Sequence, residues 1–536
     1  MHCLLVCPRV PDWSFLNYKD VCELLGARYP ATPLGLLTAA ALLPQAWEFR
    51  LLDLNVEEMD DALFDWADLV LATAMIPQQA GLLEAIERSH RHGKRIAVGG
   101  PGPSSQPEVF AGADYRVLDE GELSVPAFLA DWERGVERGL YRSEAKADMT
   151  ASPAPRFDLA DYSKYEHADV QFSRGCPCSC EFCDVPDVYG RRPRTKTPEQ
   201  MLAELDALAR AGHRGHVHIV DDNFIGNRAE AKRFLRRLAD WGKAHGNPFF
   251  FGVNATISLA DDEELLALMG EADVRFVFCG IETPDPGLLM QIHKEVNTRG
   301  PIVGNVHRLN QHGLIVTAGF ILGFDNEGPG TAQGIVDCVE SSGIAMALVG
   351  LLVALPATAL GRRLTAEGRF VEERDMPQGR PMVDQTTEGL NFRTLRPKAE
   401  ILADYAAVLR RVYHPSSYFQ RVVSTALRVR RVARYKPNRR EWARLLRAFG
   451  RVVRRLGWSR RTGPAFWRAV AAVLLRRPAA LETAFTLMAL YVHLGKQVDH
   501  LVPMVEERMH RLRAETPAGQ PSYGPGLRLV EIGGVR

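Results

Sequence analysis

Three closely spaced cysteines are the residues of this sequence best suited to carry chemistry. Cys176, Cys180 and Cys183 stand in the stretch Ser173-Arg-Gly-Cys-Pro-Cys-Ser-Cys-Glu-Phe-Cys-Asp. Thiolate sulfur is a soft ligand that suits iron–sulfur clusters, so three such residues on one loop can bind three irons of a [4Fe–4S] cubane. The fourth iron then has no protein ligand. The spacing therefore predicts a cluster with one coordination position open to a small chelating molecule.

A structural zinc site is the main alternative for this segment. Zinc normally has four ligands, and Cys178 lies between the other three cysteines and could complete the set. We interpret Cys178 as a bystander to the cluster, and Cys279 and Cys338 as core residues, because free cysteine packs like a small apolar side chain. The sequence has only 9 cysteines among 536 residues, which is no disulfide framework and fits a reducing compartment.

The cysteine segment follows a predicted strand and opens an α/β region that extends to about residue 364. Short apolar runs predict strands at Asp169–Ser173, His216–Val220, Phe249–Asn254, Arg275–Gly280, Ile315–Leu322 and Ala347–Leu352. The helix predicted at Pro198–Ala211 has Thr197 as its N-cap and Gln200 at the third position. About six strand–helix units predict a partial (β/α)6 barrel, with the site at the carboxyl ends of its strands.

The residues before this region predict a second α/β fold. Strands are predicted at Cys3–Cys7, Glu48–Leu54, Leu69–Ala74, Arg95–Gly99 and Tyr115–Leu118, with helices such as Leu82–His92 between them. This is a doubly wound, Rossmann-like pattern. Met149–Arg156 is rich in Pro, Ala and Ser and predicts a linker. We expect domains at 1–145, 160–370 and 385–536, the last mostly helical.

Composition restricts the class of protein. Hydrophobic residues make up 46% and charged residues 24% of the chain, and the formal net charge is +1, so a wholly nucleic-acid-binding protein is excluded. The N-terminus lacks the pattern of a signal peptide, and no uninterrupted apolar run reaches the roughly 18 residues that span a bilayer. We expect a cytoplasmic protein.

The cysteine spacing and its place after the first strand resemble the radical SAM superfamily, whose members bind S-adenosylmethionine (SAM) on the open iron. The resemblance implies that Asp221 and Asp222, in Val220-Asp-Asp-Asn-Phe, hold the SAM amino group, although the family more often has Gly-Gly-Glu there. It also implies that Glu282 binds the SAM ribose. Lys294 is a candidate for the SAM carboxylate or a solvated helix lysine. The adenine motif implies roles for Gly319 and Gly323, in Gly319-Phe-Ile-Leu-Gly323.

The N-terminal region resembles the cobalamin-binding domain of the B12-dependent branch of this superfamily. The matching segments are Pro33-Leu-Gly-Leu, Asp53-Leu-Asn, Gly99-Gly-Pro and Asp119-Glu-Gly-Glu. They imply that Asp53, Gly99, Gly100, Glu120 and Gly121 contact cobalamin. The motif Asp-x-His-x-x-Gly is absent, so we expect no histidine ligand on the lower face of cobalt. A domain that has lost the cofactor and serves as a scaffold is the alternative.

Further segments resemble the subfamily that contains the hopanoid C-2 methylases. These are Tyr189-Gly-Arg-Arg-Pro-Arg-Thr-Lys-Thr-Pro, Gly280-Ile-Glu-Thr-Pro and Leu355-Pro-Ala-Thr-Ala-Leu. Cys178 departs from that subfamily, which has another residue after the proline. The resemblance implies a cobalamin-dependent radical SAM C-methyltransferase acting on a small molecule or a lipid, with flavodoxin or ferredoxin as electron donor. A rearrangement or cyclisation without methyl transfer, and a cobalamin- or SAM-binding sensor, are the alternatives.

Arginine is concentrated near the end of the chain. Between residues 410 and 477 it occurs in pairs such as Arg439-Arg440 and Arg454-Arg455, interleaved with Trp442, Trp458 and Trp467. This pattern is typical of a helix on an anionic membrane surface, although it also suits RNA or a solvated helical subdomain. We expect contact with the inner face of the membrane and no nucleic-acid partner.

Overall fold

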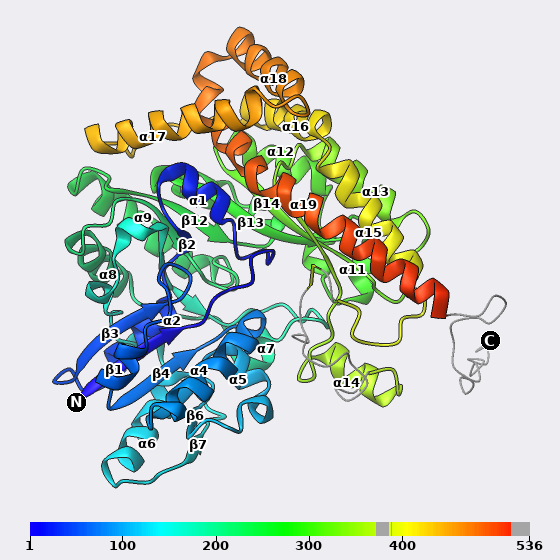
Figure 1. Cartoon of the computed structure of the whole chain (residues 1–536). Helices are drawn as coiled ribbons and strands as arrows, with labels where there is room; N and C mark the ends of the chain where they lie inside the picture. Colours follow the sequence, from blue (N-terminus) through cyan, green and yellow to red (C-terminus); the bar gives the residue numbers. More distant parts are fainter. Residues whose placement is uncertain (371–384, 387–388, 516–536) are drawn as a thin grey trace.

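Two parallel sheets, each flanked by helices, form the frame of the protein in a computed structural model that describes residues 1–370, 385–386 and 389–515 (Figure 1). In the first sheet the strand order is β3-β1-β4-β5-β6-β7. The strands are β1 (His2–Cys7), β3 (Glu48–Asp53), β4 (Leu69–Thr73), β5 (Arg95–Gly99), β6 (Tyr115–Val117) and β7 (Gly139–Tyr141). Because the order reverses at β1, this is the doubly wound fold that the sequence predicts.

Helices on both faces of the first sheet connect its strands. They are α2 (Leu34–Leu42), α3 (Asp61–Trp66), α4 (Gln79–Arg91), α5 (Pro101–Ser105) and α6 (Gly121–Glu133). Helix α1 (Lys19–Leu25) follows β1 but packs away from this sheet, against C-terminal helices and the short strand Tyr29–Ala31. The helix predicted at Leu82–His92 is α4, which begins slightly earlier.

The second sheet is the curled half-barrel, with the strand order β15-β14-β13-β12-β11-β8-β2. The strands are β8 (Tyr165–Val170), β11 (Gly215–Ile219), β12 (Phe249–Asn254), β13 (Val274–Glu282), β14 (Ile315–Leu322) and β15 (Ala347–Leu351), with β2 (Tyr29–Ala31) at the edge. The sequence predicts the first six but not β2. This short strand comes from the N-terminal region and pairs in parallel with β8, Tyr29 opposite Tyr165 and Ala31 opposite His167. The N-terminal region that builds the first sheet therefore also supplies the edge strand of the second.

The strand predicted at Asp169–Ser173 is wrong at its carboxyl end, because β8 stops at Val170. The carboxylate of Asp221 accepts a hydrogen bond from the Phe172 backbone N–H (2.7 Å) and one from the Ser173 hydroxyl (2.6 Å). These side-chain hydrogen bonds take the place of the backbone hydrogen bonds that a neighbouring strand would make. The chain then turns away, and Ser173–Arg174 (β9) pairs with Arg194–Thr195 (β10).

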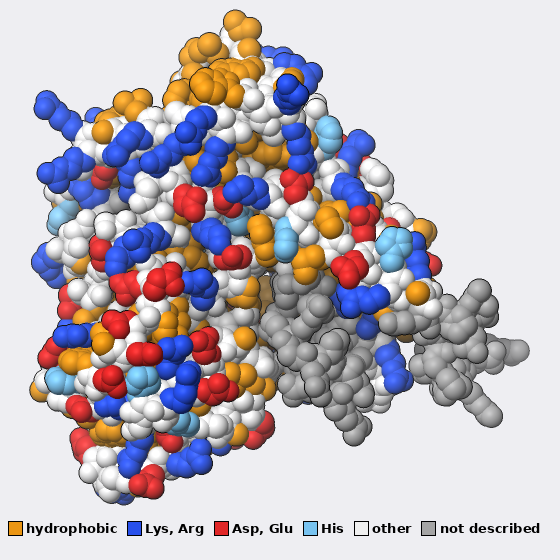
Figure 2. Space-filling model, in the orientation of Figure 1, with side chains coloured by type: hydrophobic (Ala, Val, Ile, Leu, Met, Phe, Trp, Pro, Cys, Tyr) orange, Lys and Arg blue, Asp and Glu red, His pale blue; other side chains and the backbone are white. Residues whose placement is uncertain are grey.

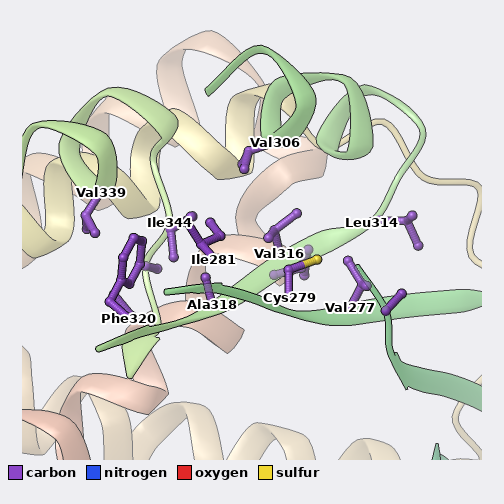
Figure 3. Close-up of a cluster of buried hydrophobic side chains, with 14 of the residues drawn as sticks. Val277, Cys279, Ile281, Val306, Leu314, Val316, Ala318, Phe320, Val339 and Ile344 are labelled. Atoms are coloured by element: carbon purple, nitrogen blue, oxygen red, sulfur yellow. The ribbon is translucent and has the colours of Figure 1, made fainter. Parts of the chain in front are cut away.

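Helices cover the outer face of the half-barrel. They are α8 (Pro198–Arg210), α9 (Arg228–Ala244), α10 (Glu263–Glu271), α11 (Pro286–Gln291), α12 (Ile302–Gln311) and α13 (Thr331–Ser342). Two short helices lie elsewhere: α7 (Val185–Val188) follows the cysteine loop and contacts α5, and α14 (Ala359–Ala366) follows β15. Thr197 and Gln200 exchange the two hydrogen bonds of the predicted capping box, at 3.2 and 2.9 Å. Apolar side chains of β13 and β14 pack against α12 and α13 (Figure 3). Cys279 and Cys338 are buried in this core, as predicted.

In the part of the C-terminal region that the structure describes, five α-helices follow the half-barrel: α15 (Lys398–Val412), α16 (Pro415–Arg428), α17 (Arg439–Val452), α18 (Gly463–Arg476) and α19 (Leu481–Glu515). A π-helical turn at Val453–Gly457 ends α17. The long helix α19 runs back across the molecule to α1, where Nδ1 of His493 lies 3.0 Å from Oδ2 of Asp20. None of the described helices combines the length and apolar character that crossing a membrane requires.

Candidate functional site

Residues from all three parts of the chain line a cavity of about 1620 Å³. Its walls come from the carboxyl ends of the first sheet, the interior of the half-barrel, and the helices α17 and α19. A drug-sized ligand needs a pocket of about 300–1,000 Å³, so this space has room for more than one ligand. The carboxyl strand ends predicted to form the site do line it.

The predicted cluster ligands Cys176, Cys180 and Cys183 all line this cavity, and so does Cys178. The loop that carries them needs glycine at Gly175, where φ is +94° and a Cβ atom would lie 2.8 Å from the Gly190 carbonyl oxygen. The Cys176 N–H donates to that same carbonyl at 3.2 Å. Three thiols on one constrained loop, facing a large cavity, fit the donor set of a [4Fe–4S] cluster with an open iron.

The charges beside the cysteine loop also suit an anionic cluster. Lys294 is buried, with its ammonium group hydrogen-bonded to the carboxylate of Glu282. Burial by itself would lower the pKa of Lys294, but the charges of Glu282 and Cys180 outweigh it and raise that pKa. Glu282 has a positive φ of 64°, which is uncommon outside glycine and clusters at functional sites. Both groups line the cavity.

The structure separates the two neighbouring aspartates that the sequence assigns to SAM. Asp222 lines the cavity, and burial raises its pKa to about 6. Asp221 is fully buried, and both of its carboxylate oxygens are used in the bonds to Phe172 and Ser173. Asp221 therefore positions the start of the cysteine loop, and we keep only Asp222 as the proposed contact of the SAM amino group.

Gly319 and Gly323 lie next to a smaller cavity of about 280 Å³ rather than in its wall. A Cβ atom on Gly319 would lie 3.2 Å from the Phe278 ring, and Gly323 has a φ of +112° with Leu390 against it. The side chain between them that lines the smaller cavity is Ile321, together with Phe182 of the cysteine loop. Phe182 also lines the large cavity. The sequence analysis did not predict a role for either side chain, although Ile321 lies within the proposed adenine motif and Phe182 within the cysteine segment.

Four residues predicted to contact cobalamin line the large cavity from the first sheet: Asp53, Gly99, Gly100 and Gly121. Asp53 accepts hydrogen bonds from the Tyr165 hydroxyl (2.8 Å) and from Asn55 (2.7 and 2.9 Å). Gly99 is required because a Cβ atom there would lie 2.6 Å from the Val117 carbonyl oxygen. These positions bring backbone rather than bulky side chains to the cavity wall.

Comparison with known proteins agrees with this geometry. Residues 170–339 match the model of the radical SAM superfamily, residues 24–129 that of the B12 binding domain, and residues 358–506 that of a domain of unknown function. The chain is 41% identical to an uncharacterized methyltransferase of Synechocystis sp., over 91% of this chain and 90% of the relative. It is 37% identical to the hopanoid C-2 methylase of Rhodopseudomonas palustris, over 73% of this chain and 72% of the relative.

The chain belongs to the cobalamin-dependent radical SAM methyltransferases. Solved structures agree with the fold. The cobalamin-dependent radical enzyme OxsB with aqua-cobalamin bound superposes with a TM-score of 0.60 at 14% identity, covering 96% of this chain and 84% of that chain. The radical SAM methyltransferase TsrM of Kitasatospora setae, with cobalamin and a [4Fe–4S] cluster bound, gives 0.59 at 19% identity, covering 83% and 98%.

Two features of the cavity wall of this methyltransferase concern the predicted cobalamin site: the ion pairs of Glu120 and the origin of the histidines in that wall. The carboxylate of Glu120 lines the cavity but is already bound by Arg174 (3.1 Å) and by both terminal nitrogens of Arg194 (2.9 Å each). Glu120 therefore joins the B12-binding domain to the half-barrel, and the structure gives it no free oxygen for the corrin ring. Among the described residues, the histidines in the cavity wall are His167, His216 and His218, all from the half-barrel.

Proposed function

We propose that this methyltransferase adds a methyl group to an unactivated carbon of a hopanoid-like lipid. The observation that carries the proposal is the continuity of the cavity from the cysteine loop to an exposed apolar face of α17. Trp442, Leu446 and Phe449 line the cavity, and they are also 55%, 65% and 45% exposed. A ligand that is apolar over most of its length can therefore pass from the surface to the cysteines along apolar side chains.

When bound, the cofactors would supply the reactive chemistry: methyl transfer from cobalamin and radical chemistry from SAM on the iron–sulfur cluster. The residues of the chain bind and orient these groups. Cys176, Cys180 and Cys183 hold the iron–sulfur cluster, while Asp222 and Glu282 bind SAM. The first sheet would hold cobalamin, and among the described residues it contributes no histidine to the cavity wall. We further propose flavodoxin or ferredoxin as the electron donor.

The surface around the cavity mouth supports contact with an anionic membrane. Figure 2 shows hydrophobic side chains gathered over α18 and Lys and Arg side chains along α17. Trp458 is 76% exposed and Leu475 is 85% exposed. Between residues 405 and 481 the only acidic residue is Glu441. Apolar anchors surrounded by arginine are what a helix on an anionic lipid surface needs.

Product analysis tests this function. The reconstituted full-length protein, reduced and supplied with SAM and a hopanoid-containing lipid extract, should yield a lipid heavier by one methylene group. S-adenosylhomocysteine and 5′-deoxyadenosine should form in equal amounts, because each methylation consumes one SAM by each route. 5′-Deoxyadenosine formed with an unmethylated, altered product would instead indicate a rearrangement or cyclisation. Absence of any turnover with bound cofactors would favour a sensor.

A further inference from the structure

A second group of potential metal ligands lies in the same cavity, at the opposite end of the half-barrel from the cysteines. Glu166 and His167 stand near the start of β8, and His216 stands near the start of β11. The cysteine loop follows the other end of β8. At about 3.3 Å per residue, His216 lies roughly 13 Å from Val220, where β11 has ended. This group is therefore separate from the iron–sulfur site.

The ligand atoms of this group lie close enough together for one ion to contact all three. Oε2 of Glu166 lies 2.8 Å from Nδ1 of His167 and 3.2 Å from Nδ1 of His216. One ligand atom from each residue lies within 4.8 Å of those of the other two. Zinc bonds to nitrogen and oxygen of about 2.0–2.1 Å separate the ligands of a tetrahedral ion by roughly 3.3 Å. A single ion thus fits between the three atoms with small side-chain adjustments.

The surroundings of the two imidazoles also match a metal site. Nε2 of His167 lies 3.3 Å from Oδ1 of Asp169, a carboxylate that is only 9% exposed. That oxygen has no hydrogen bond to any other residue in the described part of the chain. A histidine that binds a metal almost always presents its other nitrogen to a carboxylate or carbonyl in this way. The His216 ring stacks on Phe250 at 5.2 Å with a tilt of 5°, which fixes its orientation.

We propose that Glu166, His167 and His216 bind a Zn²⁺ ion whose fourth coordination position faces the cavity. Two imidazoles and one carboxylate are a ligand set that zinc favours, and three protein ligands leave one position for water or for an oxygen of a cavity ligand. The methylation proposed above is not needed for this inference, since the site is defined by its own side chains. A network of hydrogen bonds among the same groups, with no ion, is the competing arrangement.

Metal analysis of the full-length protein tests the proposal directly. After anaerobic incubation with Zn²⁺ and gel filtration, the reconstituted protein should retain about one zinc per chain in addition to its iron. X-ray absorption at the zinc edge should show nitrogen and oxygen neighbours at about 2.0 Å and no sulfur at about 2.3 Å. Sulfur neighbours would place the zinc on cysteines and overturn the proposal. Absence of retained zinc would do the same and would favour the hydrogen-bond network.

Substitutions locate the ion. Glu166→Gln keeps the size of the side chain and should lower zinc affinity at least tenfold, as should His216→Ala. Asp169→Asn should lower it about 10- to 100-fold through the orientation of His167. His218→Asn is the matched control, because His218 lies on β11 with His216 and lines the same cavity. In the described part of the chain, its hydrogen-bond partner is Asn254, at 3.2 Å. Iron content reports whether each variant is folded. Unchanged zinc affinity in a folded Glu166→Gln variant would exclude the site.

Discussion

Arg174 donates two parallel hydrogen bonds to Glu122 across the boundary between the two sheets, at 2.8 and 3.0 Å. Both side chains are about nine-tenths buried, with exposed fractions of 11% and 8%. Arg174 stands two residues before Cys176, whereas Glu122 opens α6 of the B12-binding domain. The position of the cysteine loop is therefore tied to the B12-binding domain.

The ion pair of Arg174 and Glu122 should make the free energy of unfolding fall as the pH is lowered into the acid range. Burial by itself would raise the pKa of Glu122, but the hydrogen bonds and charge of Arg174 outweigh it and lower that pKa to about 2, from an ordinary value of 4.5. The stabilisation is therefore complete above about pH 4.5 and is lost as pH falls towards 2. Glu122→Gln should unfold more easily at neutral pH, by about 3 kcal/mol. Its stability should also change less steeply between pH 4.5 and 2. Equal slopes for both proteins in urea titrations would contradict this assignment.

The three cysteines should be necessary for the cluster and Cys178 should not. Anaerobically reconstituted protein should hold about four irons per chain at this site. Replacing Cys176, Cys180 and Cys183 together with alanine should remove the iron and the cleavage of SAM. Cys178→Ala should retain both, and iron analysis with electron paramagnetic resonance of the reduced protein measures this. Loss of the cluster in Cys178→Ala alone would show that our ligand assignment is wrong.

The buried pair of Lys294 and Glu282 should show strong energetic coupling. Lys294→Met leaves the Glu282 carboxylate buried without its cation, which should destabilise the protein by about 3–5 kcal/mol. Adding Glu282→Gln should recover much of this loss, because the double variant carries no unpaired charge. A double-mutant cycle by chemical unfolding measures the coupling. Additive effects of the two changes would indicate that the groups do not depend on each other.

Cobalamin binding should be blocked by filling the cavity from α2. Gly35 lines the cavity, and a Cβ atom there would meet no other atom within 4 Å. The full-length protein should bind about one hydroxocobalamin per chain, and Gly35→Phe should lower its affinity at least tenfold. Gly270→Phe is the control, because Gly270 has equally open surroundings on α10. The Co(II) spectrum should show no nitrogen splitting, and a histidine signal would overturn the proposed lower face.

Membrane contact should depend on both the apolar residues and the charge of the C-terminal helices. The protein should sediment with anionic vesicles and be released by 1 M salt, where the Debye length is about 3 Å. Leu446→Glu and Leu475→Glu should each weaken sedimentation several-fold. Met290→Glu should not, since Met290 is 60% exposed but lies on α11, outside these helices. Binding that ignores lipid charge would exclude the electrostatic part of the interaction.

Local patterns predicted the elements whose signals lie in consecutive residues. The cysteine spacing predicted three cluster ligands that the fold brings to one cavity, and the apolar runs located most strands of the half-barrel. Thr197 and Gln200 predicted the start of α8 because a capping box is contained within four residues. The strand β2 was not predicted because it is only Tyr29-Pro-Ala31. Three residues are too few to show the alternation of a strand, and proline is uncommon within strands.

Patterns of consecutive residues could not predict contacts between segments that lie far apart in the sequence. Glu120 was assigned to cobalamin from its place in a strand-end loop, whereas its partners Arg174 and Arg194 lie far along the chain. Asp221 and Asp222 look equivalent in the sequence, but successive side chains after a strand point to opposite sides. Only the fold reveals that Glu166 and His216 meet, because His216 stands in a predicted strand whereas Glu166 lies in no predicted element, 50 residues earlier.

The strand β2 also decides how molecules can enter and leave. The chain of the B12-binding domain includes β2. Rotating that domain away from the half-barrel would therefore break the strand pairing of Tyr29 with Tyr165 and of Ala31 with His167. A clamshell motion of the two halves is therefore costly, unlike in enzymes whose domains meet at a single linker. We expect exchange of substrate and product to proceed through local movements of α17 at the cavity mouth. The rate of turnover would then be set at the end of the molecule that carries α17.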